Sequence, residues 1–312
     1  MHSPLSSRLI KTLLVIGTCI SLNAQAEPLP VIQVANGVYV HQGVHEDFNE
    51  NYHGDIANIG FVIGTDAVAV IDTGGSYKIG SSLKEAIRLI SKLPIRYVIN
   101  THVHPDHIFG NAAFTNEHPT FIGHEKLPET MALRQDAYLR NLKSELGLAA
   151  ENSAVIAPTI TVSIGKNLEI DLGKRVLQLK AWPTAHTNTD LTVVDVSTKT
   201  LWTGDLLFVE RAPSIDGDIK GWLSAIAGLK NMPADLAIPG HGPVTKNKNT
   251  ALDNERRYLD LLLRDVRASI KNGEDMTKAM GTAAQDEKSH WVLFDAVNRR
   301  NVNLIYPVLE WE

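Results

Sequence analysis

The chain contains very little cysteine: Cys19 is the only one in 312 residues. A chain with one thiol forms no internal disulfide and offers no thiolate cluster to a metal, so its fold must depend on a hydrophobic core and on other ligands. Aromatic residues are also few, at 6%, whereas 44% of the residues are hydrophobic and 21% are charged. These values are typical of a globular protein, and the length suits one large domain or two small ones.

An excess of positive charge is also missing, since the formal net charge is −5. A mildly acidic chain lacks the electrostatic footprint of a nucleic-acid-binding protein. We therefore expect a small-molecule or carrier-bound substrate and no nucleic acid. Nothing in the composition specifies an oligomeric state.

Long apolar runs are absent except near the N-terminus. Arg8 and Lys11 precede an apolar stretch over residues 13–22, and Ala24-Gln25-Ala26 supplies the small residues that a signal peptidase recognises. The stretch is too short to span a bilayer comfortably. We expect residues 1–26 to be a cleaved signal peptide, which implies a periplasmic protein with no stable membrane span.

Two other readings of this N-terminus remain open. The segment could stay uncleaved as a membrane anchor, or Cys19 could carry a lipid, although residues 16–18 form a poor lipobox. Cleavage would remove Cys19, two basic residues and no acidic one, so the net charge would change from −5 to −7. The mature chain, residues 27–312, would then have no cysteine ligand for a metal.

The most informative stretch is Thr101-His102-Val103-His104-Pro105-Asp106-His107. It follows Ile95–Asn100, an apolar and β-branched run that predicts a buried strand, and Pro105 suits the first turn of a helix. Residues two apart in extended backbone point the same way, so His102 and His104 can reach one metal ion. Asp106 and His107 follow on the turn and point elsewhere, so the loop can serve two ions.

A polar surface loop rich in histidine is the alternative interpretation. It would be preferred for a single histidine, because surface and structural histidines outnumber ligands. Four side chains of metal-binding type within six positions reverse that preference.

Three later segments place a side chain of metal-binding type after an apolar run. They deliver His186, Asp205 and His241. Glycines next to Asp205 and His241 let the backbone pass close to a crowded site. Each of the three is unconvincing alone, but with the loop at 102–107 they complete a set of five histidines and two aspartates.

A few other residues receive smaller roles. Residues 43–54 predict a polar loop, whose His45 and His53 could line the mouth of the site. We interpret His124, which follows an apolar run, as structural. Arg211 and Trp222 could contact substrate, although Trp222 is favoured as a core residue.

Strand-like runs occur in two groups, each followed by a helical pattern, over residues 31–148 and 160–271. We expect two β-rich halves packed face to face with helices outside. No low-complexity linker separates them, so we predict a single domain. Helical patterns over residues 252–271 and 291–309 predict a helical C-terminal extension from about residue 250.

The order HxHxDH, His, TGD and PGHG over residues 58–243 resembles that of the metallo-β-lactamase superfamily. The resemblance implies an α+β fold, a four-layer αββα sandwich. It also implies two zinc ions, with manganese or iron possible: His102, His104 and His186 on one, Asp106, His107 and His241 on the other, and Asp205 bridging. Asp72, after an early strand, would support the site from behind the ligands.

The resemblance further implies an exported hydrolase in which a hydroxide shared by the two ions attacks an ester, thioester or related bond. Asp106 would orient that nucleophile and receive its proton. Thioester hydrolases, lactonases and phosphodiesterases of the family usually have an aspartate at the position of Asp205, whereas members that hydrolyse β-lactams usually lack it. A class-B-like β-lactamase is therefore the alternative to the favoured ester-type hydrolase. The turn after His186 reads His186-Thr187-Asn188-Thr189-Asp190 and departs from the pattern Gly-His-Thr-x-Gly of many members.

Two less favoured hypotheses belong to other functional classes. One is a di-iron redox protein, although such relatives carry a flavin-binding domain and no glycine-rich nucleotide loop follows residue 243. The other is a non-catalytic protein that docks a carrier, although all seven ligand positions are filled. Residues 204–222 and 300–312 are similar to periplasmic metallohydrolases associated with quinoprotein dehydrogenases and with sulfur oxidation.

Overall fold

A computed structural model of the chain describes residues 26–47 and 52–312. The expected signal peptide falls in residues 1–25 apart from its last position, so that prediction lies outside the described part. Part of the polar loop expected over residues 43–54 also lies outside it. In the described part, no helix has both the length and the apolar character needed to cross a membrane.

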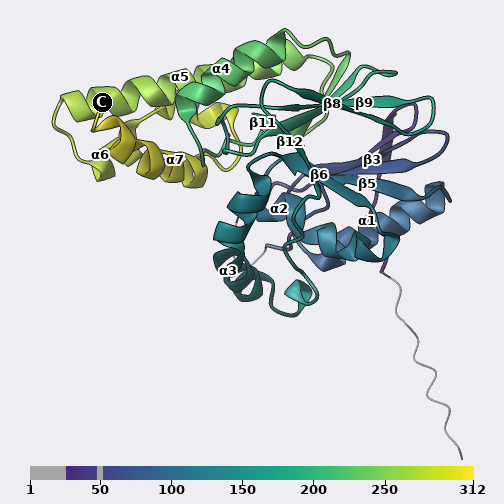
Figure 1. Ribbon diagram of the computed structural model, residues 1–312. Helices are drawn as coiled ribbons and strands as arrows, with labels where there is room; N and C mark the ends of the chain where they lie inside the picture. The colour runs from purple at the N-terminus through teal and green to yellow at the C-terminus, as the bar shows by residue number, and fades with distance from the viewer. Residues whose placement is uncertain (1–25, 48–51) are drawn as a thin grey trace, which may run out of the picture.

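Two β-sheets form the centre of the molecule (Figure 1). The first sheet has seven strands that lie side by side in chain order. Its first four are antiparallel, and β4 to β7 run parallel to one another. The strands are β1 (Ile32–Ala35), β2 (Val38–His41), β3 (Ile59–Ile63), β4 (Val68–Ile71), β5 (Ile95–Ile99), β6 (Thr120–His124) and β7 (Ile160–Val162).

The second sheet has five strands in the order β12-β11-β10-β9-β8, and only β11 and β12 are parallel. They are β8 (Asn167–Asp171), β9 (Val176–Ala181), β10 (Leu191–Asp195), β11 (Thr200–Phe208) and β12 (Leu236–His241). Every residue of β11 and β12 is buried, as their apolar sequences predict.

The two sheets pack face to face over one apolar layer. Val62 and Ile99 of the first sheet belong to the same buried cluster as Leu179 and Val193 of the second. These residues alternate with outward-facing ones along their strands, which is the period expected when one face of a sheet is covered.

Helices cover the outer faces of the sandwich. α1 (Tyr77–Ile90) begins at Ser76, whose side chain accepts a hydrogen bond from the Ile79 amide, and packs on the first sheet. Two helices cover the second sheet, α4 (Ile219–Lys230) and α5 (Lys248–Lys271). The expected four-layer α+β sandwich is therefore confirmed.

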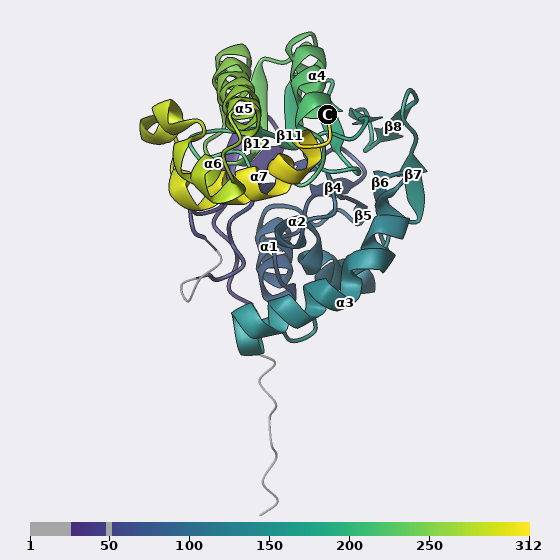
Figure 2. The ribbon, with the colours of Figure 1, turned by 90° about the vertical axis from the view of Figure 1, so that its left-hand side faces the viewer.

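Between β5 and β7 the chain forms α2 (Pro105–Ile108), the 3-10 helix η1 (Phe109–Glu117), α3 (Leu127–Leu146) and the 3-10 helix η2 (Gly147–Ala150). Pro105 occupies the first turn of α2, as predicted. Figure 2 shows α3 below α7, so these two helices lie on opposite sides of one end of the sandwich.

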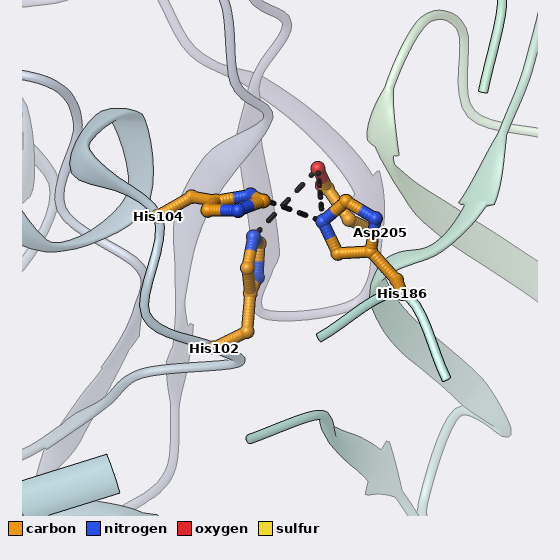
Figure 3. A group of neighbouring side chains, drawn as sticks. All are labelled: His102, His104, His186 and Asp205. Carbon is orange, nitrogen blue, oxygen red and sulfur yellow. Dashed lines mark hydrogen bonds and ion pairs between the residues drawn. The ribbon is translucent and has the colours of Figure 1, made fainter. Parts of the chain in front are cut away.

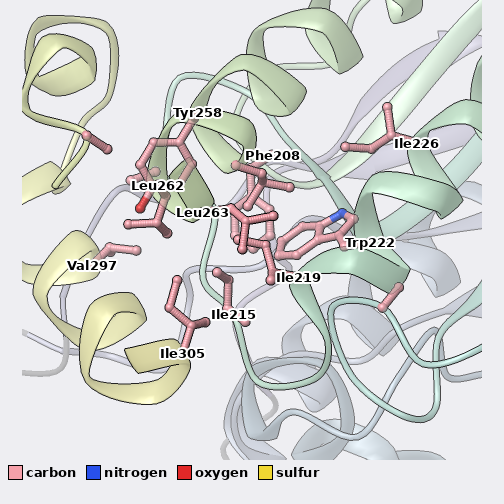
Figure 4. Close-up of a cluster of buried hydrophobic side chains, with 14 of the residues drawn as sticks. Phe208, Ile215, Ile219, Trp222, Ile226, Tyr258, Leu262, Leu263, Val297 and Ile305 are labelled. Atoms are coloured by element: carbon pink, nitrogen blue, oxygen red, sulfur yellow. The ribbon is translucent and has the colours of Figure 1, made fainter. Parts of the chain in front are cut away.

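The C-terminal extension consists of α6 (Met276–Thr282), the 3-10 helix η3 (Gln285–His290) and α7 (Phe294–Leu309), packed against α5. Tyr258 and Leu262 of α5 meet Val297 and Ile305 of α7 in a cluster that continues to Trp222 (Figure 4). Trp222 is fully buried, so it belongs to the core, as the sequence favoured.

Arg175, in the turn between β8 and β9, joins the two sheets. Its guanidinium donates to both carboxylate oxygens of Asp195, at 3.1 and 2.6 Å, within the second sheet. It also donates to the carbonyl oxygens of Ile63 and Asn36 in the first sheet, each at 2.8 Å. One buried cation thus ties the ends of four strands together.

Candidate metal centre

The first group of candidate ligands comes from both sheets. His102 and His104 follow β5, His186 lies in the loop between β9 and β10, and Asp205 lies within β11. Their ligand atoms all lie within 4.8 Å of one another, and the side chains point toward one another in Figure 3. Nδ1 of His104 is 3.0 Å from Nε2 of His186.

The second group consists of Asp106 and His107, on α2, and His241, the last residue of β12. Oδ2 of Asp106 is 3.6 Å from Nε2 of His107 and 3.4 Å from Nε2 of His241. All three residues are buried. The HxHxDH loop therefore contributes two residues to each group.

Asp205 contacts both groups. Its Oδ2 lies 3.3 Å from Nε2 of His186 and 3.2 Å from Nε2 of His241. Its Oδ1 lies 3.1 Å from Nε2 of His107. This carboxylate is therefore placed where a bridging ligand would lie.

Hydrogen bonds on the far side of the rings fix the orientation of His102 and His107. Nδ1 of His107 donates to Oδ2 of Asp72 at 2.8 Å. The Thr101 hydroxyl donates its proton to Oδ2 of Asp72 at 2.6 Å. The same hydroxyl oxygen accepts a hydrogen bond from Nδ1 of His102 at 3.0 Å. Both imidazoles therefore turn Nε2 toward the site. Asp72 supports two ligands at once, from a left-handed backbone conformation with φ of 52°.

The other three imidazoles are held in the same manner. Nδ1 of His186 donates to the Ser214 carbonyl and Nδ1 of His241 to the Ile56 carbonyl, both at 2.7 Å. Nε2 of His104 donates to Oδ2 of Asp216 at 2.9 Å. His104 thus presents Nδ1 to the site, whereas the other four present Nε2.

The donor atoms fit cations. The outer nitrogens of His104 and His186 carry the protons, so Nδ1 of His104 and Nε2 of His186 face each other without a proton. Two lone pairs therefore point at each other across 3.0 Å, an arrangement that a cation between them would stabilise. Nε2 of His102, Nε2 of His107 and Oδ1 of Asp205 are buried with no hydrogen-bond partner among the described residues. Tetrahedral zinc with bonds of about 2.0–2.1 Å separates two ligand nitrogens by roughly 3.3 Å, which is close to the spacing here.

The electrostatic balance of the site also favours bound cations. Burial acts to raise the pKa of Asp205, but the imidazoles of His241, His107 and His102 outweigh it and hold that pKa well below its usual range. Burial lowers the pKa of His186 to about 3. The carboxylate is therefore ionised and this imidazole is neutral at neutral pH, which are the forms that ligate metals.

Gly240 makes room for Asp205. A Cβ atom at position 240 would lie 1.8 Å from Oδ1 of Asp205 and 2.8 Å from the Asp205 amide nitrogen. Gly204 meets the side chain of Thr101 in the same manner and has a φ of +50°. The glycines that the sequence placed beside the ligands are therefore required by close packing.

Other residues singled out in the sequence have different positions. His124 is buried and bonds to the Trp182 carbonyl and the Lys126 amide, so it is structural. His45 lies 3.8 Å from Glu210, whereas the side chain of His53 is 73% exposed and contacts Glu46. Arg211 lines the cavity over the ligands. Three further residues that the sequence did not reveal also line it: Arg134, Asp216 and Arg300.

A family model described as the metallo-beta-lactamase superfamily matches residues 53–241, which is more than half of the chain. A linear primary-alkylsulfatase from Pseudomonas sp. is 27% identical over 124 residues, or 39% of this chain. The match spans 21% of that relative's length.

Two solved structures illustrate the fold-level similarity. A metallo-β-lactamase from Pontibacter korlensis superposes with a TM-score of 0.57 at 21% identity, over 74% of this chain and 99% of that chain. A stereoselective inverting sec-alkylsulfatase from Pseudomonas sp. superposes with a TM-score of 0.68 at 16% identity, over 90% of this chain and 50% of that chain.

Proposed function

Because this chain belongs to the metallo-β-lactamase superfamily, we propose that it is a dinuclear zinc-dependent hydrolase of ester, thioester or related bonds. The observation that carries the proposal is Asp205, whose carboxylate contacts both groups of histidine ligands. Nitrogen and oxygen donors without thiolate suit zinc, and they also accommodate manganese or iron. When bound, the ions would supply Lewis acidity and a hydroxide nucleophile near neutral pH.

Each of the seven residues has an assigned place in this proposal. His102, His104 and His186 hold one ion, Asp106, His107 and His241 hold the other, and Asp205 holds both. Asp72 and Asp216 keep His107 and His104 in the ligating tautomer through the hydrogen bonds at 2.8 and 2.9 Å. These outer partners would add to metal affinity because they fix ring orientation before the ion arrives.

Asp106 has a second role, which is to orient the nucleophile and receive its proton. Its side chain is only 7% exposed, yet it lines the cavity in which a substrate would lie. A carboxylate in that position is within reach of both a ligand group and a bound substrate.

The type of bond is proposed from the ligand set and from the relatives. An aspartate at the bridging position favours ester-type over β-lactam hydrolysis, and one relative is a linear primary-alkylsulfatase. Hydrolysis of β-lactams stays the alternative, and the fold-level similarity to β-lactamase structures gives it no additional support.

We further propose an exported, periplasmic enzyme, with a small-molecule or carrier-bound substrate and no nucleic acid. The basis is the N-terminal sequence and the acidic net charge. We also propose a role in quinoprotein or sulfur metabolism, which the resemblance of residues 204–222 and 300–312 to metallohydrolases of those systems supports.

Elemental analysis of the purified protein, followed by a hydrolysis screen, tests the proposal. We expect about two metal ions per chain and turnover of an ester or thioester. His102→Ala should lose at least one ion and most activity, because it removes a ligand whose Nε2 has no other partner. A protein that takes up no metal would overturn the proposal.

Asp106→Ala, measured in the same way, tests the second role of Asp106. We expect turnover to fall even in preparations reloaded with metal to the wild-type content. Full turnover at full metal content would restrict Asp106 to ligation. Because the same screen includes esters, thioesters, lactones and β-lactams, it also decides between ester-type hydrolysis and the alternative.

A further inference from the structure

A cavity of about 440 Å³ lies directly over the two ligand groups. His104, Asp106, Asp205 and His241 line it, and most of the remaining wall comes from α3, α7 and the segment after β11. Three arginines reach it from these three elements: Arg134, Arg300 and Arg211.

Two of the arginines are neutralised by aspartates. Arg134 forms an ion pair with Asp216, which in turn accepts from His104. Arg300 pairs with Asp47 at 2.6 Å. These two guanidinium groups therefore keep α3 and α7 in place around the cavity and contribute little net charge to it.

Arg211 differs from them. It is only 5% exposed, and among the described residues its hydrogen-bond partner is the Glu46 carbonyl, at 2.9 Å. The described residues give it no ion pair, and the acidic groups that act on it most strongly are Asp106 and Asp205. A buried guanidinium is costly unless its charge is compensated. Because no carboxylate of residues 26–47 or 52–312 forms an ion pair with Arg211, its N–H donors suit a ligand that supplies an anion.

The charge balance leads to the same conclusion. Two divalent cations and the hydroxide that they share would bring three net positive charges, and Asp72, Asp106 and Asp205 would remove three. Arg211 adds one, so the loaded centre carries an excess of one positive charge. An anionic substrate compensates this excess, whereas a neutral one leaves it in place.

Apolar side chains also line the cavity. Val297 and Leu304 of α7 and Tyr138 of α3 line it, and Leu304 is 36% exposed. An alkyl chain or ring in contact with these side chains would be removed from water, which favours binding by about 25 cal/mol per Å² of apolar surface.

We propose that the substrate joins an oxyanion, bound through Arg211 beside the metal centre, to an apolar body that lies against α7. Sulfate, phosphate and carboxylate all match the two parallel N–H donors of a guanidinium, so the shared chemistry is an oxygen-rich anion. This inference deepens the proposed hydrolase and rests on it. It assigns Arg211 as the residue that determines specificity for the anion.

Calorimetric titration of the metal-loaded full chain with octane-1-sulfonate, below its micelle concentration, tests the inference. The sulfonate has no ester bond and is not hydrolysed. We expect it to bind at least tenfold more tightly than octan-1-ol, because charge-assisted hydrogen bonds to Arg211 are stronger than neutral ones. Octyl phosphonate and octanoate, titrated in parallel, identify the preferred anion.

Arg211→Gln should weaken sulfonate binding at least tenfold and leave octanol binding and metal content unchanged. Arg211→Lys should restore part of the affinity, since it returns the charge without the fork. Arg264→Gln is the matched control, because Arg264 is an exposed arginine of α5 that pairs with Asp265 away from the cavity. Methanesulfonate should bind more weakly than octane-1-sulfonate, because it lacks the apolar body.

Equal affinity for octanol and the sulfonate, or unchanged sulfonate binding by Arg211→Gln, would overturn the inference. Equal affinity for octane-1-sulfonate and methanesulfonate would show that an apolar body does not contribute to binding. Each of these results, in a protein that retains its metal and hydrolyses esters, leaves the proposed function standing. A wild-type protein without metal would instead overturn the proposed function.

Discussion

At the scale of single residues, the candidate centre depends on how closely two backbones approach beside Asp205. Gly240 on β12 leaves no room for a methyl group, because the nearest atoms are the Asp205 carboxylate and the backbone of β11. A carboxylate can swing away from a methyl group, but a buried strand can move only with its neighbours.

Gly240→Ala should therefore displace Asp205 while the protein remains folded. We expect metal affinity to fall by roughly 10- to 100-fold, as it does when support around a metal ligand is lost. Circular dichroism and metal titration measure the two effects. Gly281→Ala is the control: nothing lies within 4 Å of its added Cβ atom, and alanine favours the helix there. Unchanged metal affinity in Gly240→Ala would contradict the assigned contact.

The sequence predicted the seven candidate ligands but not all of the residues around them. His102, His186 and Asp205 could be identified because metal-binding side chains follow apolar strands. Asp216 and Arg134 could not, since their partners lie 112 and 82 positions away and no local pattern reports such a pair. Arg211 was singled out only as a side chain that could contact substrate.

At the scale of secondary structure, the Arg175–Asp195 pair determines how the two sheets are joined. Burial acts to raise the pKa of Asp195, but hydrogen bonds from Arg175 and Thr198 outweigh it and lower that pKa. A lowered pKa in the folded state stabilises the fold above the unfolded-state pKa of about 3.9, and this stabilisation is lost as the pH falls further.

Asp195→Asn should lower the free energy of unfolding at pH 7 by about 3 kcal/mol, because it leaves a buried guanidinium unpaired. The difference from wild type should shrink as the pH falls below about 4. Urea unfolding across this range measures it. Asp260→Asn, which breaks the exposed Arg256–Asp260 pair, should cost less than about 1 kcal/mol. Parallel stability profiles for wild type and Asp195→Asn would contradict the assigned role.

The element boundaries differ from the expected ones where polar residues interrupt an apolar run. β11 continues to Phe208, although Gly204 and Asp205 are residue types that usually end a strand. The register of its pairing with β12 shifts around Gly204, and the strand continues past this glycine. β7 was grouped with the second half but pairs with β6 of the first sheet. α6 was missed because seven residues give a weak helical pattern.

At the scale of the whole molecule, the sandwich is joined at its two ends by different means. The candidate ligands join both sheets at one end, where Asn58, next to β3, donates to the Pro239 and Gly242 carbonyls. Arg175 joins them at the other end, beside Ile63, where β3 finishes. Metal would therefore stabilise one end of the molecule more than the other.

Hydrogen exchange before and after chelation tests this asymmetry. We expect amides at the metal end, such as those of Asn58 and Trp182, to exchange faster once the metal is removed. The amides of Ile63 and Leu172, close to Arg175, should keep their protection. A uniform change in exchange along the strands would contradict the asymmetry. In the metal-loaded protein, Arg175→Gln should instead give the fast exchange at the end beside Ile63 and Leu172.

The four-strand junction at Arg175 has a consequence for how the enzyme matures. A junction that needs no ion can hold the two sheets together without metal, so we expect the apoprotein to keep its sandwich fold. Metal ions would then bind at the opposite end of the sandwich, where the candidate ligands lie, in a chain that has already folded. Assembly of the centre would be the last event, and it would be reversible without loss of the fold.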